Sequence, residues 1–283
     1  MLNRSLKLDA ITALEKTHQR YESSAASVTK EAEKLMLTRK RCSEQVIVNV
    51  ERYINQLANS PKQFDRSYDE FKAEYRAFDT LLEEIKFEAE KADFKAGGSA
   101  AAGVSAGVAT AAFAPSAAMA IATTFGTAST GTAISALSGA AASNAALAWL
   151  GGGAVAAGGS GMAGGGALLA MANPVGLAVG VAALVGSGFF ARSKNREIAE
   201  KCYTRRKEIE VLDAALQASL ADIRELNDAT QKHADGINSM LTWLQVNAPE
   251  DYLDFDKDAK DKLAALVNHL RSLTPLINQT VKR

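Results

Sequence analysis

No charged side chain occurs between Ala96 and Ala191, a stretch of 96 residues, although the chain carries 32 basic and 32 acidic residues elsewhere. All three histidines also lie outside this charge-free block, whereas 20 of the 21 glycines lie inside it. Soluble domains normally carry charges in every surface loop, so such a block must avoid water in its working state or be sheathed until then. The segregation divides the chain into a charged arm (1–95), an apolar middle (96–191) and a second charged arm (192–283).

The N-terminal arm has the alternating steps of three and four residues that are typical of coiled-coil helices. One apolar run begins at Ile11 and continues, less cleanly after Leu35, to Tyr53, which predicts a helix over most of 4–58. A second run extends over Phe64–Ala92. The preceding Ser60-Pro61-Lys62-Gln63 combines a capping serine, a proline at the first helical position and a capping-box glutamine, so we expect this helix to start there.

The C-terminal arm keeps the same spacing over Ile198–Leu244 until Pro249 ends the pattern. A helix of 45 to 55 residues is about 70–80 Å long, so the arms must pack along each other in an elongated bundle. We expect Phe64–Ala92 to lie beside Ile198–Leu244, because both runs flank one insertion. A last amphipathic helix, which Pro275 kinks or ends, places five apolar residues on one face: Leu263, Leu266, Val267, Leu270 and Leu273. The predicted fold is all-α: long coiled-coil helices with a Gly/Ala-rich hydrophobic helical head.

The charge-free block is long enough for three or four membrane-spanning helices, each of which needs about 20 apolar residues. The strongest candidate is Ala167–Ala191, because a basic cluster starts at Arg192 directly after it. Val104–Phe125 and Thr132–Leu150 are weaker candidates. Trp149 is either an interfacial anchor or a packing residue at a turn. The residues predicted to enter the membrane are Phe113, Phe125, Trp149, Leu168, Leu169, Val179, Leu184, Phe189 and Phe190.

Small residues recur every four positions in the same block, which favours close helix–helix packing in lipid. The glycines predicted to form these ridges are Gly103, Gly107, Gly131, Gly139, Gly161, Gly165, Gly176 and Gly180. A tract so rich in alanine and glycine also produces such spacings by chance, so the missing charges carry the argument. Gly151-Gly152-Gly153 and 158–166 are typical of bends between helical pieces.

Enzyme motifs are not supported. The segment 159–164 matches G-x-G-x-x-G, but no strand precedes it and no carboxylate follows before Glu197 to meet a ribose. His18 and His233 fall on apolar seams and His269 is remote in sequence, so we interpret the seam histidines as buried side chains and not as ligands. We expect no catalytic residue, metal site or cofactor.

Charge and cysteine content also limit the classes of partner that we expect for this chain. The arms carry 17 basic with 17 acidic and 15 basic with 15 acidic residues, so neither offers the basic footprint of a nucleic-acid binder. Cys42 and Cys202 lack metal-ligand spacing, and we interpret them as buried thiols. The N-terminus has no apolar run of signal-peptide length. We therefore expect synthesis in the cytoplasm and membrane association in the active state, with export by a non-classical route left open.

Two heptad-bearing arms around a hydrophobic middle resemble the α-helical pore-forming toxins of the cytolysin A and haemolysin BL type, and also the apolipoprotein L layout. The segment 131–153 is similar to glycine-zipper segments of uncharacterised bacterial proteins. The resemblance implies a protein that inserts its middle and oligomerises, with itself or with partner helical subunits, to permeabilise a lipid membrane as a toxin or defence effector. The alternative is a constitutive membrane protein whose arms form a coiled-coil scaffold.

Overall fold

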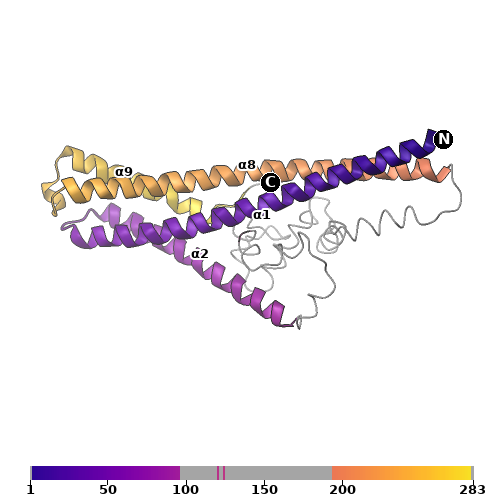
Figure 1. The fold of residues 1–283 in the computed structure, drawn as a ribbon. Helices are drawn as coiled ribbons and strands as arrows, with labels where there is room; N and C mark the ends of the chain where they lie inside the picture. Colours follow the sequence, from indigo (N-terminus) through magenta and orange to yellow (C-terminus); the bar gives the residue numbers. More distant parts are fainter. Residues whose placement is uncertain (1, 96–119, 121–123, 125–192, 282–283) are drawn as a thin grey trace.

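The computed structural model describes residues 2–95, 120, 124 and 193–281, and within them it contains helices and no strand. The all-α prediction is therefore confirmed. The described elements, in chain order, are α1 (Leu2–Gln56), α2 (Lys62–Lys95), α8 (Ser193–Asn247), the 3₁₀ turn η4 (Tyr252–Asp254) and α9 (Lys257–Asn278). Figure 1 shows two long helices side by side, with α2 and α9 folded back from one end.

The two long helices follow the predicted apolar runs. Both α1 and α8 have 55 residues, about 82 Å at 1.5 Å per residue. The helix predicted over most of 4–58 is α1, and the run over Ile198–Leu244 is contained in α8. Helix α8 ends at Asn247, two residues before Pro249, because the residue before a proline is driven away from helical geometry.

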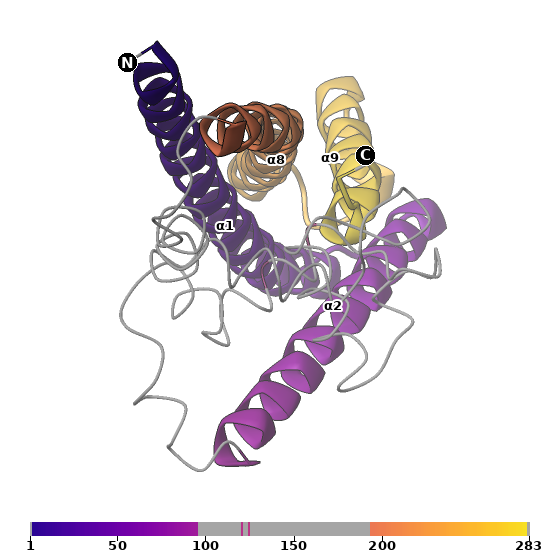
Figure 2. The ribbon, with the colours of Figure 1, turned by 90° about the vertical axis from the view of Figure 1, so that its right-hand side faces the viewer.

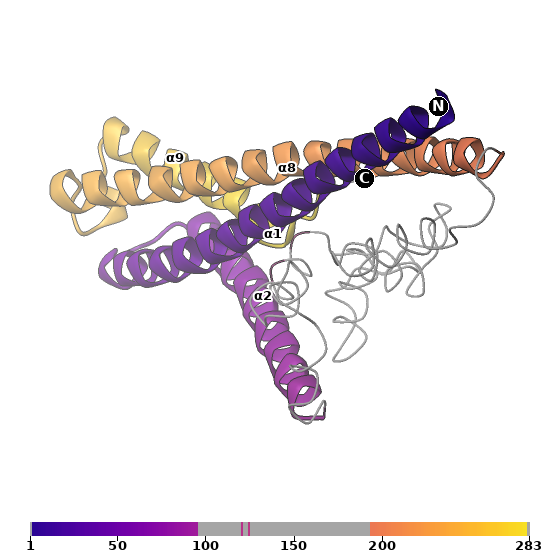
Figure 3. The same cartoon turned by 45° about the vertical axis from the view of Figure 1, so that its right-hand side comes forward.

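The partner of α8 differs from our prediction: it packs along α1 and not along α2. Helices α1 and α8 run parallel, since Arg20 bonds to Asp213 and Asn49 bonds to Asn238 at nearly the same sequence separation, 193 and 189 residues. Figure 2 and Figure 3 show α2 leaving this pair at a wide angle. The expectation that Phe64–Ala92 lies beside Ile198–Leu244 was therefore wrong, because α1 offers α8 a seam of equal length whereas α2 packs against α9.

Helix α9 lies between α8 and α2. It runs parallel to α2, as shown by the bond from Arg271 Nε to Ser67 Oγ (3.1 Å) and that from Asn278 Nδ2 to Glu74 Oε2 (2.7 Å), both at a separation of 204 residues. All five apolar residues predicted for its inner face are buried. Pro275 lies inside the helix and does not end it, since the helix continues for three more residues to Asn278.

The start of α2 agrees with the prediction in position but not in chemistry. The helix begins at Lys62, and the Pro61 carbonyl accepts its first backbone bond from Phe64 N at 2.8 Å. Ser60 Oγ donates to Asp65 Oδ1 at 2.7 Å. Gln63, oriented to accept, places its side-chain oxygen 2.9 Å from Arg271 Nη2. The expected capping box is thus replaced, because the tertiary contact with α9 uses the glutamine.

The turns after α1 and α8 meet at one end of the molecule, called the tip here and comprising residues 57–61 and 248–256. Ala58 N donates to Glu250 O at 2.8 Å and Tyr252 N donates to Ala58 O at 3.0 Å, a short parallel bridge. Asn59 has a positive φ of 52°, which asparagine tolerates better than most residues, and its amide donates to both Asp251 carboxylate oxygens. These bonds join the two helical hairpins at their turns.

No helix among the described residues is long and apolar enough to cross a membrane. The three predicted spans fall in 96–191, where only residues 120 and 124 are described.

Candidate functional site: the α1–α8 interface and its junctions

The residues predicted to enter the membrane and the predicted glycine ridges, including Phe113, Val179 and Gly139, lie outside the described residues. What the structure does describe is the framework to which the charge-free block is attached, since α2 ends at Lys95 and α8 begins at Ser193. The candidate site is therefore the interface that holds the start of α8 against α1. Two further contacts farther along the arms belong to it, one at Arg39 and one at a pair of histidines.

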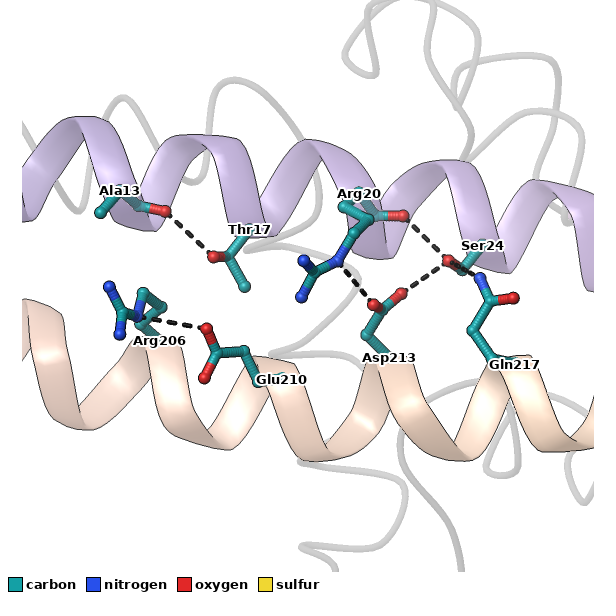
Figure 4. Close-up of polar contacts among 8 residues, drawn as sticks. All are labelled: Ala13, Thr17, Arg20, Ser24, Arg206, Glu210, Asp213 and Gln217. Atoms are coloured by element: carbon teal, nitrogen blue, oxygen red, sulfur yellow. Dashed lines mark hydrogen bonds and ion pairs between the residues drawn. The ribbon is translucent and has the colours of Figure 1, made fainter.

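A polar layer interrupts this interface and consists of Arg20 and Ser24 on α1 with Asp213 and Gln217 on α8 (Figure 4). Arg20 Nε donates to Asp213 Oδ2 at 2.7 Å, and Ser24 Oγ lies 2.6 Å from the other carboxylate oxygen. Gln217 Nε2 donates to the same serine oxygen at 2.7 Å. Each carboxylate oxygen of Asp213 thus has a partner, as a buried charge requires.

The polar layer fixes geometry more than it adds stability. The Asp213 side chain is 8% exposed, whereas its partner Arg20 is 57% exposed and keeps most of its hydration. An ion pair with one solvated partner contributes little to stability, while the desolvation of the carboxylate opposes folding. A buried polar contact of this kind does select one register, because a slip of the parallel helices would leave Asp213 without its partners.

The layer separates two hydrophobic clusters of very different size. The main core starts beyond it, at Val28 on α1 and Leu220 on α8, and continues to the tip. The cluster on the other side, next to the start of α8, contains five buried residues: Ala10, Leu14, Ala199, Cys202 and Ile209. Hydrophobic stabilisation scales with buried apolar area, so this cluster of five buried side chains, with Ile11, Tyr21 and Ile198 packed against it, holds the two helices less firmly than the main core does.

Polar groups continue along this weaker segment. Thr17 is buried, and its hydroxyl donates a hydrogen bond to the Ala13 carbonyl at 3.0 Å (Figure 4). His18 is also buried, as the sequence predicted, and its Nε2 lies 3.3 Å from Glu22 Oε1 on the next turn. Such groups contribute less to helix pairing than leucine at the same positions would.

A second junction connects the arms to the C-terminal tail and to the charge-free block. Arg39 on α1 is completely buried, which lowers the pKa of its guanidinium to about 9, and its Nη2 donates to the Gln279 carbonyl at 2.6 Å. Two residues farther on, Val281 N donates to Thr124 O at 2.8 Å. Thr124 and Ala120 are both fully buried, and Ala120 belongs to the main core. Both described residues of the block are therefore buried, and each is connected to the arms or to the C-terminal tail.

A histidine pair forms the third feature, and sequence reasoning missed it. His233 on α8 and His269 on α9 place their Nδ1 atoms 3.1 Å apart, with the rings inclined at 62°. One Nδ1 must donate and the other accept, so at most one ring of the bonded pair carries a second proton. Burial, together with the charges of His269 and Lys232, lowers the pKa of His233.

Gly236 makes room for this pair. A Cβ atom at Gly236 would lie 2.4 Å from Cε1 of His269 and 2.6 Å from its Nδ1. Gly236 is the one glycine outside the charge-free block, and it stands inside a helix, where glycine is unfavourable. This isolated glycine was the sequence signal for a close approach between helices.

The cysteines agree with their interpretation as buried thiols. Cys42 and Cys202 are free and buried, and burial raises the pKa of each thiol. Within the described ranges no group of three or more histidine, cysteine or carboxylate side chains could hold a metal ion.

No family model, no curated protein and no solved structure matches this chain. A functional conclusion has to be argued from the residues themselves.

Proposed function

We propose that this protein is membrane-active: it inserts its charge-free block into a lipid bilayer and oligomerises there, permeabilising the membrane as a toxin or defence effector. The observation that carries the proposal is the absence of any charge over 96 consecutive residues, in a chain whose arms are rich in charge. A charged residue at the centre of a bilayer costs about 2.5–3.5 kcal/mol on insertion scales, so a block without one is suited to lipid.

The arms provide a mechanism for releasing the charge-free block. Helix α8 starts next to the block, and its first turns are held against α1 by the small cluster that contains Ala199 and Cys202. The polar layer at Asp213 then separates this segment from the main core. Opening would begin at this end and stop at the layer, because local unfolding follows the segments with the fewest buried apolar contacts.

Dye release from liposomes with purified full-length protein tests the proposal directly. We expect leakage from the wild-type chain and loss of leakage for Val179→Asp, with little change in the thermal stability of the arms. An aspartate scan over 167–191 extends the test. Leakage that tracks stability at every position would show that the block is a soluble core and would refute insertion.

A cross-link across the small cluster tests the release step. A cysteine placed at Ala10, which lies in the same cluster as the native Cys202, and joined to Cys202 by a short thiol-reactive reagent should suppress leakage. The matched control links positions 49 and 238 near the tip, whose amides are 3.2 Å apart, and should leave leakage intact. Variants that carry only one cysteine of a pair show the effect of the reagent when no such link can form. Equal leakage from both linked proteins would contradict opening at the α8 start.

Fractionation separates the proposal from a constitutive scaffold. Untagged protein that resists carbonate extraction and is never found in the soluble fraction would favour a permanently inserted scaffold. Protein that is soluble before exposure to lipid and resists extraction afterwards would favour regulated insertion.

A further inference from the structure

An open groove lies between α2 and α9 next to the tip, with a volume of about 730 Å³. Its walls come from the first turns of α2 and the last turns of α9, and they carry the cations Lys62, Arg66 and Arg271 with one carboxylate, Glu70. Small-molecule sites are commonly of about 300–1,000 Å³, so the groove is of a size to hold a small ligand. Its net positive charge contrasts with a chain whose total charge is zero.

Arg271 is positioned by neutral groups. Its Nε donates to Ser67 Oγ at 3.1 Å, and its terminal nitrogens face the Gln63 side-chain oxygen at 2.9 and 3.1 Å. Among the described residues neither Arg271 nor Lys62 takes part in an ion pair, and Arg66 pairs only with Glu70 on its own helix at 3.0 Å. An exposed pair of this kind contributes little and is easily exchanged, so all three cations can act on an anion.

We propose that this groove binds a phosphate-bearing ligand, with the Arg271 guanidinium as the fixed contact and Lys62 and Arg66 as the adaptable ones. The Arg271 guanidinium has five N–H donors, of which Ser67 and Gln63 take three, so two remain for phosphate oxygens. A multiply charged phosphate group also suits three cations that line one groove. The proposal is independent of membrane insertion, because the groove is built from α2 and α9 near the tip and not from the charge-free block.

Two probes distinguish the sources of such a phosphate. Isothermal titration with myo-inositol hexakisphosphate tests a soluble polyphosphate, and flotation with phosphatidylcholine vesicles, with or without phosphatidylinositol bisphosphate, tests a lipid headgroup. Saturable binding of the soluble probe supports a free ligand, whereas binding only to the phosphoinositide vesicles supports a headgroup. If the protein also floats with vesicles of phosphatidylcholine alone, that binding comes from the charge-free block and not from the groove. No specific binding in either arm would overturn the proposal.

Charge-neutral variants connect the binding to the groove. Lys62→Gln combined with Arg66→Gln should weaken binding by about tenfold, because the phosphate loses two of its three cations. Lys207→Gln with Arg224→Gln, two exposed α8 positions that do not line the groove, removes the same charge as a matched control. Arg271→Lys keeps the charge but loses the planar guanidinium and the contacts that position it, and should also weaken binding. Equal weakening by the control pair would refute a specific site.

Discussion

Gly236→Ala is expected to destabilise the protein although alanine is the better helix former. Alanine in place of glycine inside a helix normally gains about 1 kcal/mol. Here the new methyl group would lie 2.4 Å from the His269 ring and would force it away from His233. Overpacking costs about 1–3 kcal/mol and the lost hydrogen bond about 0.5–1.5 kcal/mol, so after the gain in helix propensity the net effect is a loss of about 0.5–3.5 kcal/mol.

The sign of the effect should reverse when the ring is absent. In a His269→Ala background the ring that the methyl group at position 236 would meet is absent, and Gly236→Ala should then stabilise by about 1 kcal/mol. Urea unfolding followed by far-ultraviolet circular dichroism measures all four proteins of the cycle. Ser239→Ala, an exposed position on the same helix, reports the gain from helix propensity alone. If Gly236→Ala stabilised both backgrounds equally, the close approach of the ring would have no energetic consequence and the reasoning would fail.

Three further predictions concern single side chains. The lowered pKa of His233 means that the fold favours its neutral form, so its contribution to stability is present above pH 6.5 and declines as the pH falls toward the folded-state pKa. His233→Gln should flatten the pH dependence of the urea midpoint in that window. Arg39→Ala, which removes the donor to the Gln279 carbonyl and leaves a cavity, should cost about 2–4 kcal/mol, whereas Arg39→Met should cost less, and both should speed carboxypeptidase digestion of the tail. Asn59→Ala should cost about 1–2 kcal/mol in the same unfolding assay, because it removes the amide bonds to Asp251 at a positive φ.

The sequence predicted those features that depend on local rules. Helix extents follow from apolar periodicity, and the inner face of α9 is the one that its spacing indicated. The end of α8 follows from Pro249. Such patterns act over a few turns of a single helix, so one sequence is enough to detect them.

The partner of each helix could not be predicted in this way. A heptad seam shows that a helix has an apolar side but not which other helix covers it. We therefore chose Phe64–Ala92 as the partner of α8 only because both flank one insertion, and the seams themselves did not exclude α1. The structure selects α1, whose length equals that of α8. The histidine pair was missed for the same reason, because 36 residues and a turn separate His233 from His269.

The sequence separations between paired residues show what keeps the two hairpins in register. Contacts from α1 to α8 occur at separations of 189 and 193 residues, and contacts from α2 to α9 occur at 204. Apolar seams alone would tolerate a shift by one heptad, since one leucine replaces another. The specific bonds at the tip and in the polar layer do not tolerate it.

Stability is therefore distributed unevenly along the same helix pair. The main core and the tip stabilise the arms, whereas the segment at the start of α8 is aligned by Asp213 and held by few apolar side chains. A segment that is well aligned but weakly held can separate and close again without losing its register. That combination, placed directly after the charge-free block, would allow the regulated release of the block that we propose.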